Sequence, residues 1–344
     1  MAYEVTIGIP VYNSEEYIRM TMDSALSQTF ESIEYLILDD CGTDNTIEII
    51  HEYQQKHYRG KDIRIVRQPQ NGGIGRARNR IVEEAQGNYL FFLDADDTIM
   101  SNAIELLYRK MRLYNAEIVY GSYEKTEDFG GIIKSTPFTY PFMKFLNDDE
   151  FAERVYSDYG FLQANTWNML IKKEIYFENN IRYKPVSFWE DFSFTMDLPT
   201  YVTRVVLLPD VTYFYYCHYG SLSHFDQRTH IDKSEIQDTL EAMASVKRNS
   251  ERLKLKPYFH KRMYKVMMTH FYMACTILKD RRVTKPSFSM REIRDVMRSP
   301  LSVEETLKLK DWRIKNLILC LLGVLPPMMS VLIIWVMGKR KGLI

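Results

Sequence analysis

The stretch YLFFLDADD, residues 89–97, decides the fold of this chain. Its first five residues are apolar or aromatic, which is typical of a strand buried on both faces. Asp94, Asp96 and Asp97 follow within four residues, and carboxylates are costly to bury without partners. We therefore expect them where the strand emerges at its carboxyl end, the edge at which open α/β sheets bind ligands.

Two carboxylates separated by one residue can share a hard divalent cation. Mg²⁺ or Mn²⁺ held by one or two protein oxygens usually completes its coordination with substrate phosphates. An isolated D-x-D pattern, however, more often marks a capped turn before a helix. Such a helix is expected here at 101–114. The neighbouring segments must decide between these interpretations.

The segments before residue 89 alternate between expected strands and helices. Apolar runs at 4–11, 35–38 and 63–66 are separated by amphipathic segments, and this β-α order predicts a doubly wound, mostly parallel sheet. The second strand also ends in acids, Asp39 and Asp40. Gly72, Gly73 and Gly75 open a helix that carries Arg76, so the backbone and the helix N-terminus can approach phosphate. These features indicate a nucleotide site, although the G-x-G-x-x-G pattern of dinucleotide-binding enzymes is missing.

Ordered blocks between residue 4 and about residue 110 resemble glycosyltransferase family 2, the inverting enzymes of the GT-A fold. The blocks read IGIPVYNSEEYI, SALSQTF, YLILDDCGTDNT, QNGGIGRARN and GNYLFFLDADD. The resemblance implies an α/β GT-A sheet followed by a C-terminal helical region. It also implies a nucleotide-sugar donor, most simply a UDP-sugar, and Mn²⁺ or Mg²⁺ as cofactor.

The same resemblance implies a role for each residue of the donor site. Pro10, Tyr12, Asn13 and Glu15 would line the base and ribose pocket, Asp40 would bind the nucleobase edge, and Gly73 and Arg76 would lie near the diphosphate. Asp94, Ala95 and Asp96 would form the D-x-D motif that touches ribose and metal, with Asp97 as an alternative metal ligand.

A second acidic pair, Glu190-Asp191, follows a loop and opens an expected helix at 192–198. Alone it would more often be a helix cap, but the upstream D-x-D favours a catalytic role. Inversion at an anomeric carbon needs one base on the acceptor hydroxyl. We expect Asp191 to be that base and Glu190 to contact the acceptor or orient Asp191. His218 and His224 are expected to be packing or surface residues.

The formal net charge of zero hides an asymmetry along the chain. Residues 1–245 carry 23 Lys and Arg against 38 Asp and Glu, whereas residues 246–316 carry 19 against 7. The basic region predicts contact with the anionic lipids of a membrane surface. No nucleic-acid reader motif is present, so nucleic acid is not an expected partner. Four cysteines without paired spacing indicate neither disulfides nor a zinc site, and the lack of a signal-like N-terminus argues against export.

Residues 316–338 are 23 consecutive uncharged residues. A single helix of that length could cross a membrane, but Pro326-Pro327 favours a break into two short helices. Basic residues flank both ends, which predicts a hairpin or in-plane anchor at the cytoplasmic face of the membrane. A hairpin buried in the protein core and a kinked single span are the alternatives.

Four ranges are expected: a nucleotide-sugar-binding half (1–117), an acceptor half (118–230), a basic helical extension (231–313) and an apolar membrane-associating hairpin (314–344). The predicted function is metal-dependent inverting transfer of a hexosyl or N-acetylhexosaminyl group to a hydroxyl of a glycan or lipid-linked acceptor, in polysaccharide biosynthesis. A non-catalytic nucleotide-binding scaffold is the alternative. Nucleotidyl transfer is disfavoured, because no glycine-rich loop with a lysine lies near the N-terminus.

Overall fold

The computed structural model describes residues 3–128, 133–158, 160–162, 165–186, 189–218, 229–310 and 312–344. Contacts divide the chain into two compact units. The sheet unit comprises Met1–Phe151, Asn165–Pro185 and Tyr201–His224, and the helical unit comprises Ala152–Ala164, Val186–Thr200 and Phe225–Ile344. This division differs from the four expected ranges, because the segment that carries Glu190 and Asp191 groups with the C-terminal helices.

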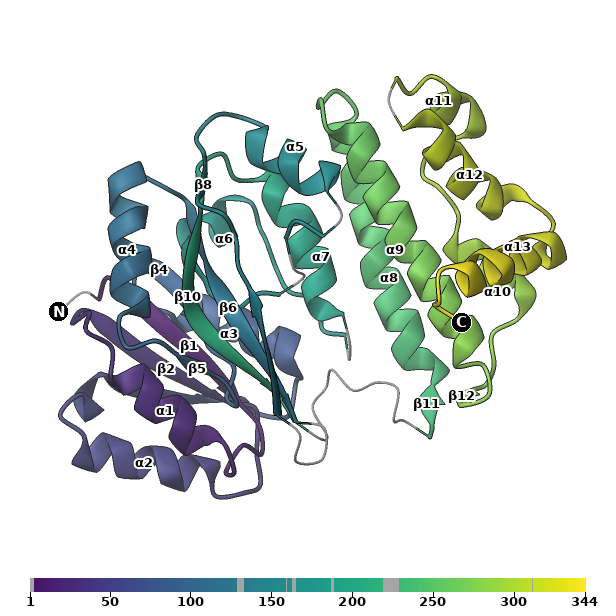
Figure 1. Cartoon of the computed structure of the whole chain (residues 1–344). Coiled ribbons are helices and arrows are strands. Elements are labelled where there is room, and N and C mark those ends of the chain that lie inside the picture. Colours follow the sequence, from purple (N-terminus) through teal and green to yellow (C-terminus); the bar gives the residue numbers. More distant parts are fainter. Residues whose placement is uncertain are drawn as a thin grey trace. The chain divides into compact units, whose positions relative to one another are not determined.

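The sheet unit contains the alternating strands and helices expected from the sequence (Figure 1). Its strands are β1 (Val5–Val11), β2 (Ile33–Asp39), β3 (Ile63–Arg67), β4 (Tyr89–Phe92), β5 (Thr98–Ile99), β6 (Ile118–Asp128), β7 (Ile133–Phe138), β8 (Met143–Phe145), β9 (Met169–Lys172) and β10 (Val205–Cys217). Its helices are α1 (Ile18–Leu26), α2 (Thr46–Lys56), η1 (Gly60–Asp62), α3 (Ile74–Glu84), α4 (Ala103–Tyr114) and α6 (Glu174–Glu178), while α5 (Glu150–Ser157) runs from this unit into the other.

The strands form one mixed sheet in the order β3-β2-β1-β4-β9-β6-β10-β5, with β7 beside β6 and β8 beside β10. Strands β1 to β4 are mutually parallel where they pair, whereas β9 is antiparallel to both β4 and β6. The residues that follow β1, β2, β3 and β4 therefore share one edge of the sheet. The predicted residues of the donor site lie at or near this edge. The shared direction of these strands confirms the expected mostly parallel α/β class.

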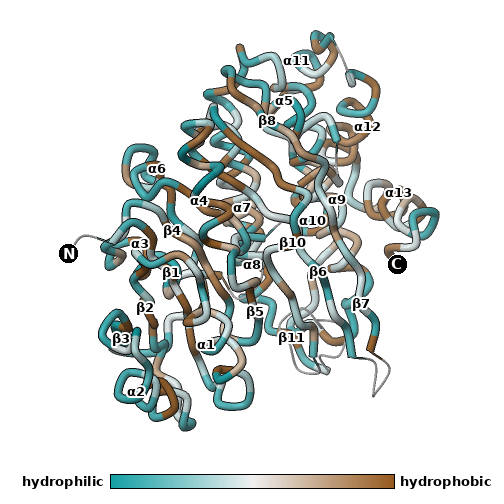
Figure 2. The backbone as a smooth tube through the Cα atoms, turned by 60° about the vertical axis from the view of Figure 1, so that its left-hand side comes forward, coloured by the Kyte–Doolittle hydropathy of each residue, from teal (hydrophilic) through white to brown (hydrophobic). Residues whose placement is uncertain are grey.

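Helices cover both faces of the parallel strands. Alternate residues of β1, such as Ile7 and Ile9, belong to the core that includes the buried faces of α1, α2 and α4. On the opposite face α3 approaches so closely that a Cβ on Gly8 would lie 2.4 Å from Cγ2 of Ile81. Every residue of β1 is buried, whereas β7, whose side chains are mostly exposed, is hydrophilic over much of its length in Figure 2. Burial on two faces explains why the parallel strands read as continuous apolar runs.

Two local features add detail to the expected order of elements. The first helix begins at Ile18, because residues 14–17 form a turn in which Ser14 O accepts from the backbone N–H groups of Tyr17 and Ile18. The runs at 205–208 and 211–216 belong to a single strand, β10, whose register against β6 shifts between Leu207 and Tyr213. Bulges of this kind let one strand bend without ending.

The helical unit is built from amphipathic helices, as expected for residues 231–316. Its elements are α7 (Glu190–Asp197), η2 (Leu198–Thr200), β11 (Ile231–Asp232), α8 (Lys233–Ser250), η4 (Glu251–Leu253), α9 (Phe259–Lys279), β12 (Thr284–Lys285), α10 (Met290–Val296), α11 (Val303–Leu307), α12 (Arg313–Val324) and α13 (Pro327–Arg340). The predicted break at the proline pair is confirmed, since α12 ends at Val324 and α13 begins at Pro327.

The run 247–265, which belongs to the basic region 246–316, has some of its cations inside this unit rather than on a surface. Arg262 is fully buried and Lys265 is 8% exposed, with its Nζ 2.9 Å from Val155 O. Lys247 donates to Val296 O and Arg298 O. Burial lowers the pKa of Lys247 to about 7 and that of Lys265 to about 8. Arg262 and Lys265 thus satisfy a carboxylate and backbone carbonyls inside the unit and are not available for the predicted contact with anionic lipids, whereas Lys247 is half-buried.

The buried imidazole of His270 in α9 predicts a pH dependence of stability. Burial, followed by the charge of Lys247, holds the His270 pKa well below its ordinary value of 6.5, and its Nδ1 lies 2.8 Å from Val266 O. The unfolded chain protonates this group below about pH 6.5, so its contribution to the free energy of unfolding is complete above that pH. Below it we expect a loss of about 1.4 kcal/mol per pH unit.

Urea unfolding of the wild type and of His270→Met between pH 6.5 and pH 5 measures this slope. The slope of the variant should be lower than that of the wild type by about 1.4 kcal/mol per pH unit, whereas His51→Met, at an exposed position, should keep the wild-type slope. The raised pKa values of Asp96 and Asp97 act with the opposite sign and equally in all three proteins. The pKa values of the Glu292 and Glu305 carboxyls are lowered to about 2. These groups change the free energy of unfolding only below about pH 4.5, outside the measured range. Equal slopes in the wild type and His270→Met would contradict the assignment.

Candidate active site

The loops that follow β1 and β2 are joined by reciprocal hydrogen bonds. Asn13 Oδ1 accepts from the backbone N–H of Thr43 at 2.7 Å, and Glu15 Oε2 accepts from that of Asn45 at 2.9 Å. Asp44 Oδ2 in turn accepts from the backbone N–H of Glu15 at 2.9 Å. Asn13 and Glu15 thus shape the rim on which they were predicted to contact the nucleoside.

Two further residues of the predicted nucleoside pocket differ in exposure. Pro10 is buried within β1, whereas the Tyr12 ring is 50% exposed immediately after that strand. An exposed aromatic face beside polar loop residues suits stacking on a base. The predicted base contacts of these residues stay predictions.

Asp40 organises the glycine loop. Its carboxylate is 4% exposed and accepts from Gln68 Nε2 and the backbone N–H of Gly72, both at 2.7 Å, and from the backbone N–H of Gly73 at 2.8 Å. A buried carboxylate needs such donors, and they fix the loop before α3. The structure therefore adds a loop-shaping role for Asp40 to the predicted contact with the nucleobase edge.

The N-terminus of α3 follows this loop. Gly73 has a φ of 75°, a conformation that favours glycine. A Cβ on Gly75 would lie 2.4 Å from Lys184 O, so the residue must stay small. Arg76, in the first turn of α3, is exposed. The helix dipole and this guanidinium place positive potential at the sheet edge, as predicted for diphosphate binding.

Asp97 is the most deeply buried residue of the DADD turn, with 0% exposure. Its Oδ2 accepts from the Tyr213 hydroxyl at 2.7 Å, and its Oδ1 accepts from the backbone N–H of Tyr216 at 2.8 Å. The Tyr213 oxygen also accepts from the backbone N–H of Asp94 at 3.2 Å. Burial, and then the charges of Asp96 and Asp94, raise the Asp97 pKa well above its usual range. Between the alternatives for the metal, this geometry favours Asp94 and Asp96 and gives Asp97 a structural role.

Asp94 lies beside a buried arginine that is absent from the predicted site. Arg78 in α3 has a side chain that is 5% exposed, and its Nη2 lies 3.1 Å from Asp94 Oδ1. Its guanidinium also lies over the Tyr183 ring, 5.8 Å from the centroid. The pairing offsets the charge of Asp94 at the end of β4. The sequence contained a signal for Arg78. It is one of three arginines in α3, and it lies on the buried face of that helix.

Asp96 contacts His218, for which the sequence predicted only a packing or surface position. His218 Nε2 lies 2.9 Å from Asp96 Oδ2, and the His218 ring stacks on Tyr17 with centroids 4.3 Å apart. Burial and the charge of Asp94 raise the Asp96 pKa, while His218 acts in the opposite direction. The adjacent Ala95 is fixed by its carbonyl, which accepts from the Thr21 hydroxyl at 2.9 Å. His218 was expected at a packing or surface position, and it both stacks on Tyr17 and contacts Asp96. His224 lies outside the described residues.

Asp94 and Asp96 fit a hard divalent cation. Their side chains are 24% and 31% exposed, so their oxygens reach solvent. A cation would relieve the repulsion that raises the Asp96 pKa. Within the described ranges, no group of three or more His, Cys, Asp and Glu side chains could hold a metal. An ion at Asp94 and Asp96 would need substrate phosphates or water as further ligands.

Glu190 and Asp191 lie in the first turn of α7, in the helical unit. Trp189, immediately before them, has a φ of 58°. For a bulky residue this left-handed conformation is uncommon and marks a locally constrained turn. The predicted acids thus open a helix, as expected, on a backbone that is held in an unfavourable conformation.

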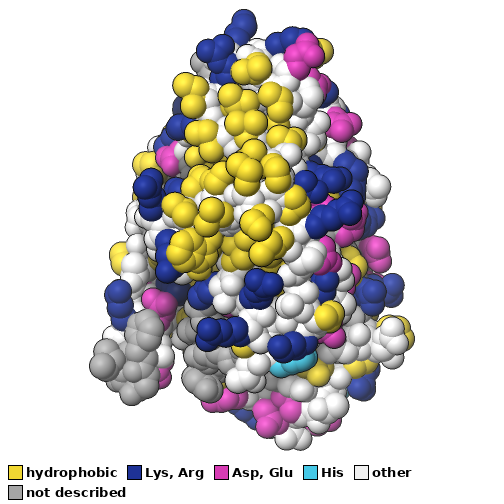
Figure 3. All heavy atoms as spheres, turned by 90° about the vertical axis from the view of Figure 1, so that its right-hand side faces the viewer, with side chains coloured by type: hydrophobic (Ala, Val, Ile, Leu, Met, Phe, Trp, Pro, Cys, Tyr) yellow, Lys and Arg dark blue, Asp and Glu magenta, His cyan; other side chains and the backbone are white. Residues whose placement is uncertain are grey.

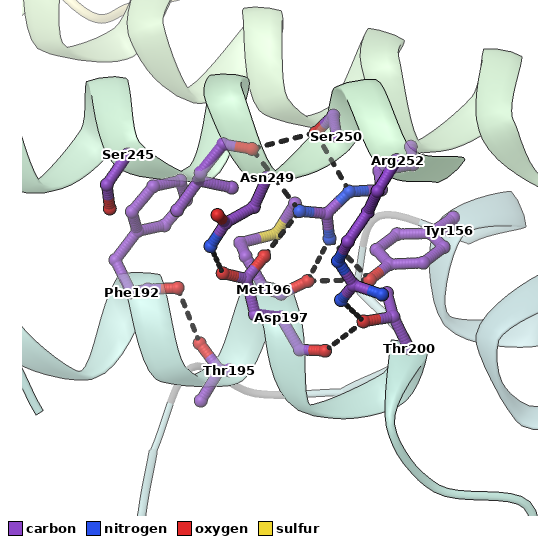
Figure 4. Close-up of polar contacts among 12 residues, drawn as sticks. Tyr156, Phe192, Thr195, Met196, Asp197, Thr200, Ser245, Asn249, Ser250 and Arg252 are labelled. Atoms are coloured by element: carbon purple, nitrogen blue, oxygen red, sulfur yellow. Dashed lines mark hydrogen bonds and ion pairs between the residues drawn. The ribbon is translucent and has the colours of Figure 1, made fainter. Parts of the chain in front are cut away.

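A buried polar network fixes the other end of α7. Arg262 of α9 forms an ion pair with Asp197 and donates to Met196 O, to Tyr156 Oη at 2.7 Å and to Ser250 Oγ at 3.0 Å. Figure 4 shows the Asp197, Met196 and Tyr156 side of this network together with Asn249, whose Nδ2 lies 2.7 Å from Asp197 Oδ2. A buried guanidinium with so many acceptors fixes the position of α7 on α8 and α9 within the unit.

Comparison with known proteins agrees with this geometry. Residues 6–176 match the model of the family described as Glycosyl transferase family 2. Glycosyltransferase GlyG of Streptococcus pneumoniae serotype 4 is 25% identical over 257 residues, which cover 71% of this chain and 79% of GlyG. Glycosyltransferase GlyA of the same organism is 28% identical over 233 residues, which cover 64% of this chain and 31% of GlyA. The matched part of this chain thus spans about a third of the length of GlyA.

A solved structure shares the fold. Residues 1–349 of TarS from S. aureus, in complex with UDP-GlcNAc, match with a TM-score of 0.67 and 16% identity, covering 98% of this chain and 92% of that chain. The sheet, its DADD turn and these matches define a GT-A fold. The chain belongs to glycosyltransferase family 2, and the expected family is confirmed.

Removing one partner of the Arg262–Asp197 pair should destabilise the protein strongly. Arg262→Met leaves Asp197 buried without its main counter-charge, so we expect the free energy of unfolding to fall by about 3–5 kcal/mol. The double variant Arg262→Met/Asp197→Leu removes both charges, so its free energy of unfolding should fall by less than that of Arg262→Met. Chemical denaturation measures both values, and a double variant less stable than Arg262→Met would contradict this account.

Proposed function

We propose that this protein is a metal-dependent inverting glycosyltransferase. It would transfer a hexosyl or N-acetylhexosaminyl group from a nucleotide-sugar donor to a hydroxyl of a glycan or lipid-linked acceptor in polysaccharide biosynthesis. The observation that carries the proposal is the edge of the sheet where Asp94 and Asp96 reach solvent beside the N-terminus of α3. A UDP-linked donor is supported by the UDP-GlcNAc bound to TarS.

The donor half follows from the residues at that edge. Tyr12, Asn13 and Glu15 would hold the nucleoside, and Arg76 with the N-terminus of α3 would bind the diphosphate. Asp94 and Asp96 would hold Mn²⁺ or Mg²⁺, which supplies charge that offsets the leaving diphosphate. His218 and Arg78 would keep the two carboxylates oriented toward the donor.

Asp191 is the proposed general base. It would accept the proton of the acceptor hydroxyl while the acceptor oxygen forms a bond to the anomeric carbon. The bond from that carbon to the diphosphate oxygen breaks on the opposite face, and the nucleoside diphosphate departs with the electron pair. Glu190 would contact the acceptor or orient Asp191, and the Arg262 network would keep α7 in place.

Separate roles for the carboxylates predict separable defects. Asp191→Asn should leave donor affinity nearly unchanged and lower turnover by about two orders of magnitude or more, the usual contribution of a general base. Asp96→Ala should instead weaken metal-dependent donor binding. Calorimetric titration with UDP-sugars and assays of nucleoside diphosphate release measure the two effects.

Asp210→Asn is the matched control, since it removes one exposed carboxylate charge on β10 away from the edge that carries Asp96. It should leave both quantities unchanged. The same donor affinity and the same residual activity in Asp191→Asn and Asp96→Ala would refute the division of roles. Donor binding without any release of nucleoside diphosphate would favour the non-catalytic scaffold.

Metal removal gives an independent test. Chelation with EDTA should abolish both donor binding and product release, because the diphosphate charge then lies beside uncompensated carboxylates. Added Mn²⁺ or Mg²⁺ should restore both. Full activity in chelated protein shown by elemental analysis to lack metal would rule out metal dependence.

A further inference from the structure

The last two helices present a continuous apolar surface to solvent. Nine large apolar side chains of α12 and α13 are between 37% and 69% exposed. We call them the α12–α13 patch: Ile314, Ile318, Leu321, Val324, Met328, Met329, Leu332, Trp335 and Val336. Figure 3 shows hydrophobic side chains gathered in one broad area on this side of the helical unit. Apolar surface of this extent usually marks an interaction site.

The buried faces of both helices combine small residues with Leu319, Leu322 and Ile334. In α13 the buried positions are Ser330, Ile334 and Gly338, spaced four residues apart. A Cβ on Gly338 would lie 2.9 Å from Cys275 Sγ, and one on Gly323 of α12 would lie 2.5 Å from Met297 O. These close contacts with α9 and with the end of α10 would be lost if either helix rotated.

A hydrogen bond between the two helices also fixes this orientation. Ser330 Oγ donates to Leu322 O at 2.6 Å, which ties the start of α13 to the last turns of α12. The outward direction of the large apolar side chains is therefore set by packing within the unit.

The charge of this segment has a single sign. Residues 312–344 contain five Lys and Arg and no Asp or Glu. Lys315 Nζ lies 4.0 Å from the centroid of the Trp312 ring, and Lys339 Nζ lies 4.5 Å from that of Trp335. Aromatic rings paired with lysine near the ends of apolar helices are typical of the boundary between lipid headgroups and acyl chains. In Figure 3 Lys and Arg side chains lie around much of the apolar area.

Neither helix is built to cross a bilayer. None of the helices in the described part of the chain is both long and apolar enough to span a membrane. The helix α12 has 12 residues and α13 has 14, about 18 and 21 Å at 1.5 Å per residue, against roughly 30 Å of hydrocarbon. The apolar face of both helices together with their basic ends suits a position in the plane of the interface.

We propose that the α12–α13 patch docks on the surface of an anionic lipid membrane. The apolar side chains would enter the upper acyl region of one leaflet, while Lys315, Lys339, Arg340 and Lys341 contact the headgroups. This proposal is independent of the proposed glycosyl transfer. A second copy of the chain is the competing occupant of the patch.

Co-sedimentation of the full-length chain with vesicles tests the proposal. The protein should bind vesicles that contain phosphatidylglycerol more tightly than vesicles of phosphatidylcholine alone, and 0.5 M salt should weaken this binding because it screens the charges. Met328→Gln/Leu332→Gln should lower the ratio of bound to free protein by about tenfold or more, since two apolar side chains leave the contact. Lys339→Gln/Lys341→Gln should reduce the preference for anionic vesicles.

Leu113→Gln/Leu255→Gln is the matched control, because both leucines are exposed outside the patch. It should bind vesicles as the wild type does. Equal binding to the two vesicle types, or equal loss in the patch and control variants, would overturn the proposal. So would a lipid-free dimer in light scattering that Met328→Gln/Leu332→Gln converts to monomer while vesicle binding is unchanged.

Discussion

The interaction between the buried Asp97 carboxylate and β10 is the constraint on which the candidate donor site depends. Its two oxygens accept from the Tyr213 hydroxyl and from the backbone of Tyr216, and Tyr213 also accepts from the backbone of Asp94. A carboxylate without exposure is tolerated only with such partners. They connect the end of β4 to a strand more than a hundred residues away in sequence. The turn between these anchors therefore presents Asp94 and Asp96 to solvent while Asp97 stays inside.

Buried polar side chains fix the other functional segments in the same way. Asp40 binds the glycine loop through two backbone N–H groups and the amide of Gln68, and Arg262 holds the C-terminal turn of α7 through Asp197 and Met196. Each of these groups is costly to bury alone and is stable only in a fully satisfied arrangement. The segments proposed to bind the donor and to carry the base are thus positioned by internal polar contacts. Hydrophobic packing forms the layers beneath them.

The sequence predicted the elements that depend on local pattern. Apolar runs identified β1 to β4, and the proline pair identified the break between α12 and α13, because burial and proline geometry act over short distances. Partners distant in sequence were not predictable: nothing near Asp97 in the chain points to Tyr213, and nothing near Asp96 points to His218. The run 247–265 shows the same limit, since Arg262 and Lys265 look like surface cations until α9 is packed. Composition reports how many charges a segment has, whereas the fold decides which of them are buried.

The role of the DADD turn can be tested most directly by diffraction from crystals of the full chain grown with UDP and Mn²⁺, recorded at the manganese absorption edge. The account predicts one anomalous peak about 2 Å from an oxygen of Asp94 or Asp96, with the Asp97 carboxylate still bound by Tyr213. A peak coordinated by Asp97 with Tyr213 displaced would contradict the account. Bound UDP with no manganese at the turn would contradict it equally.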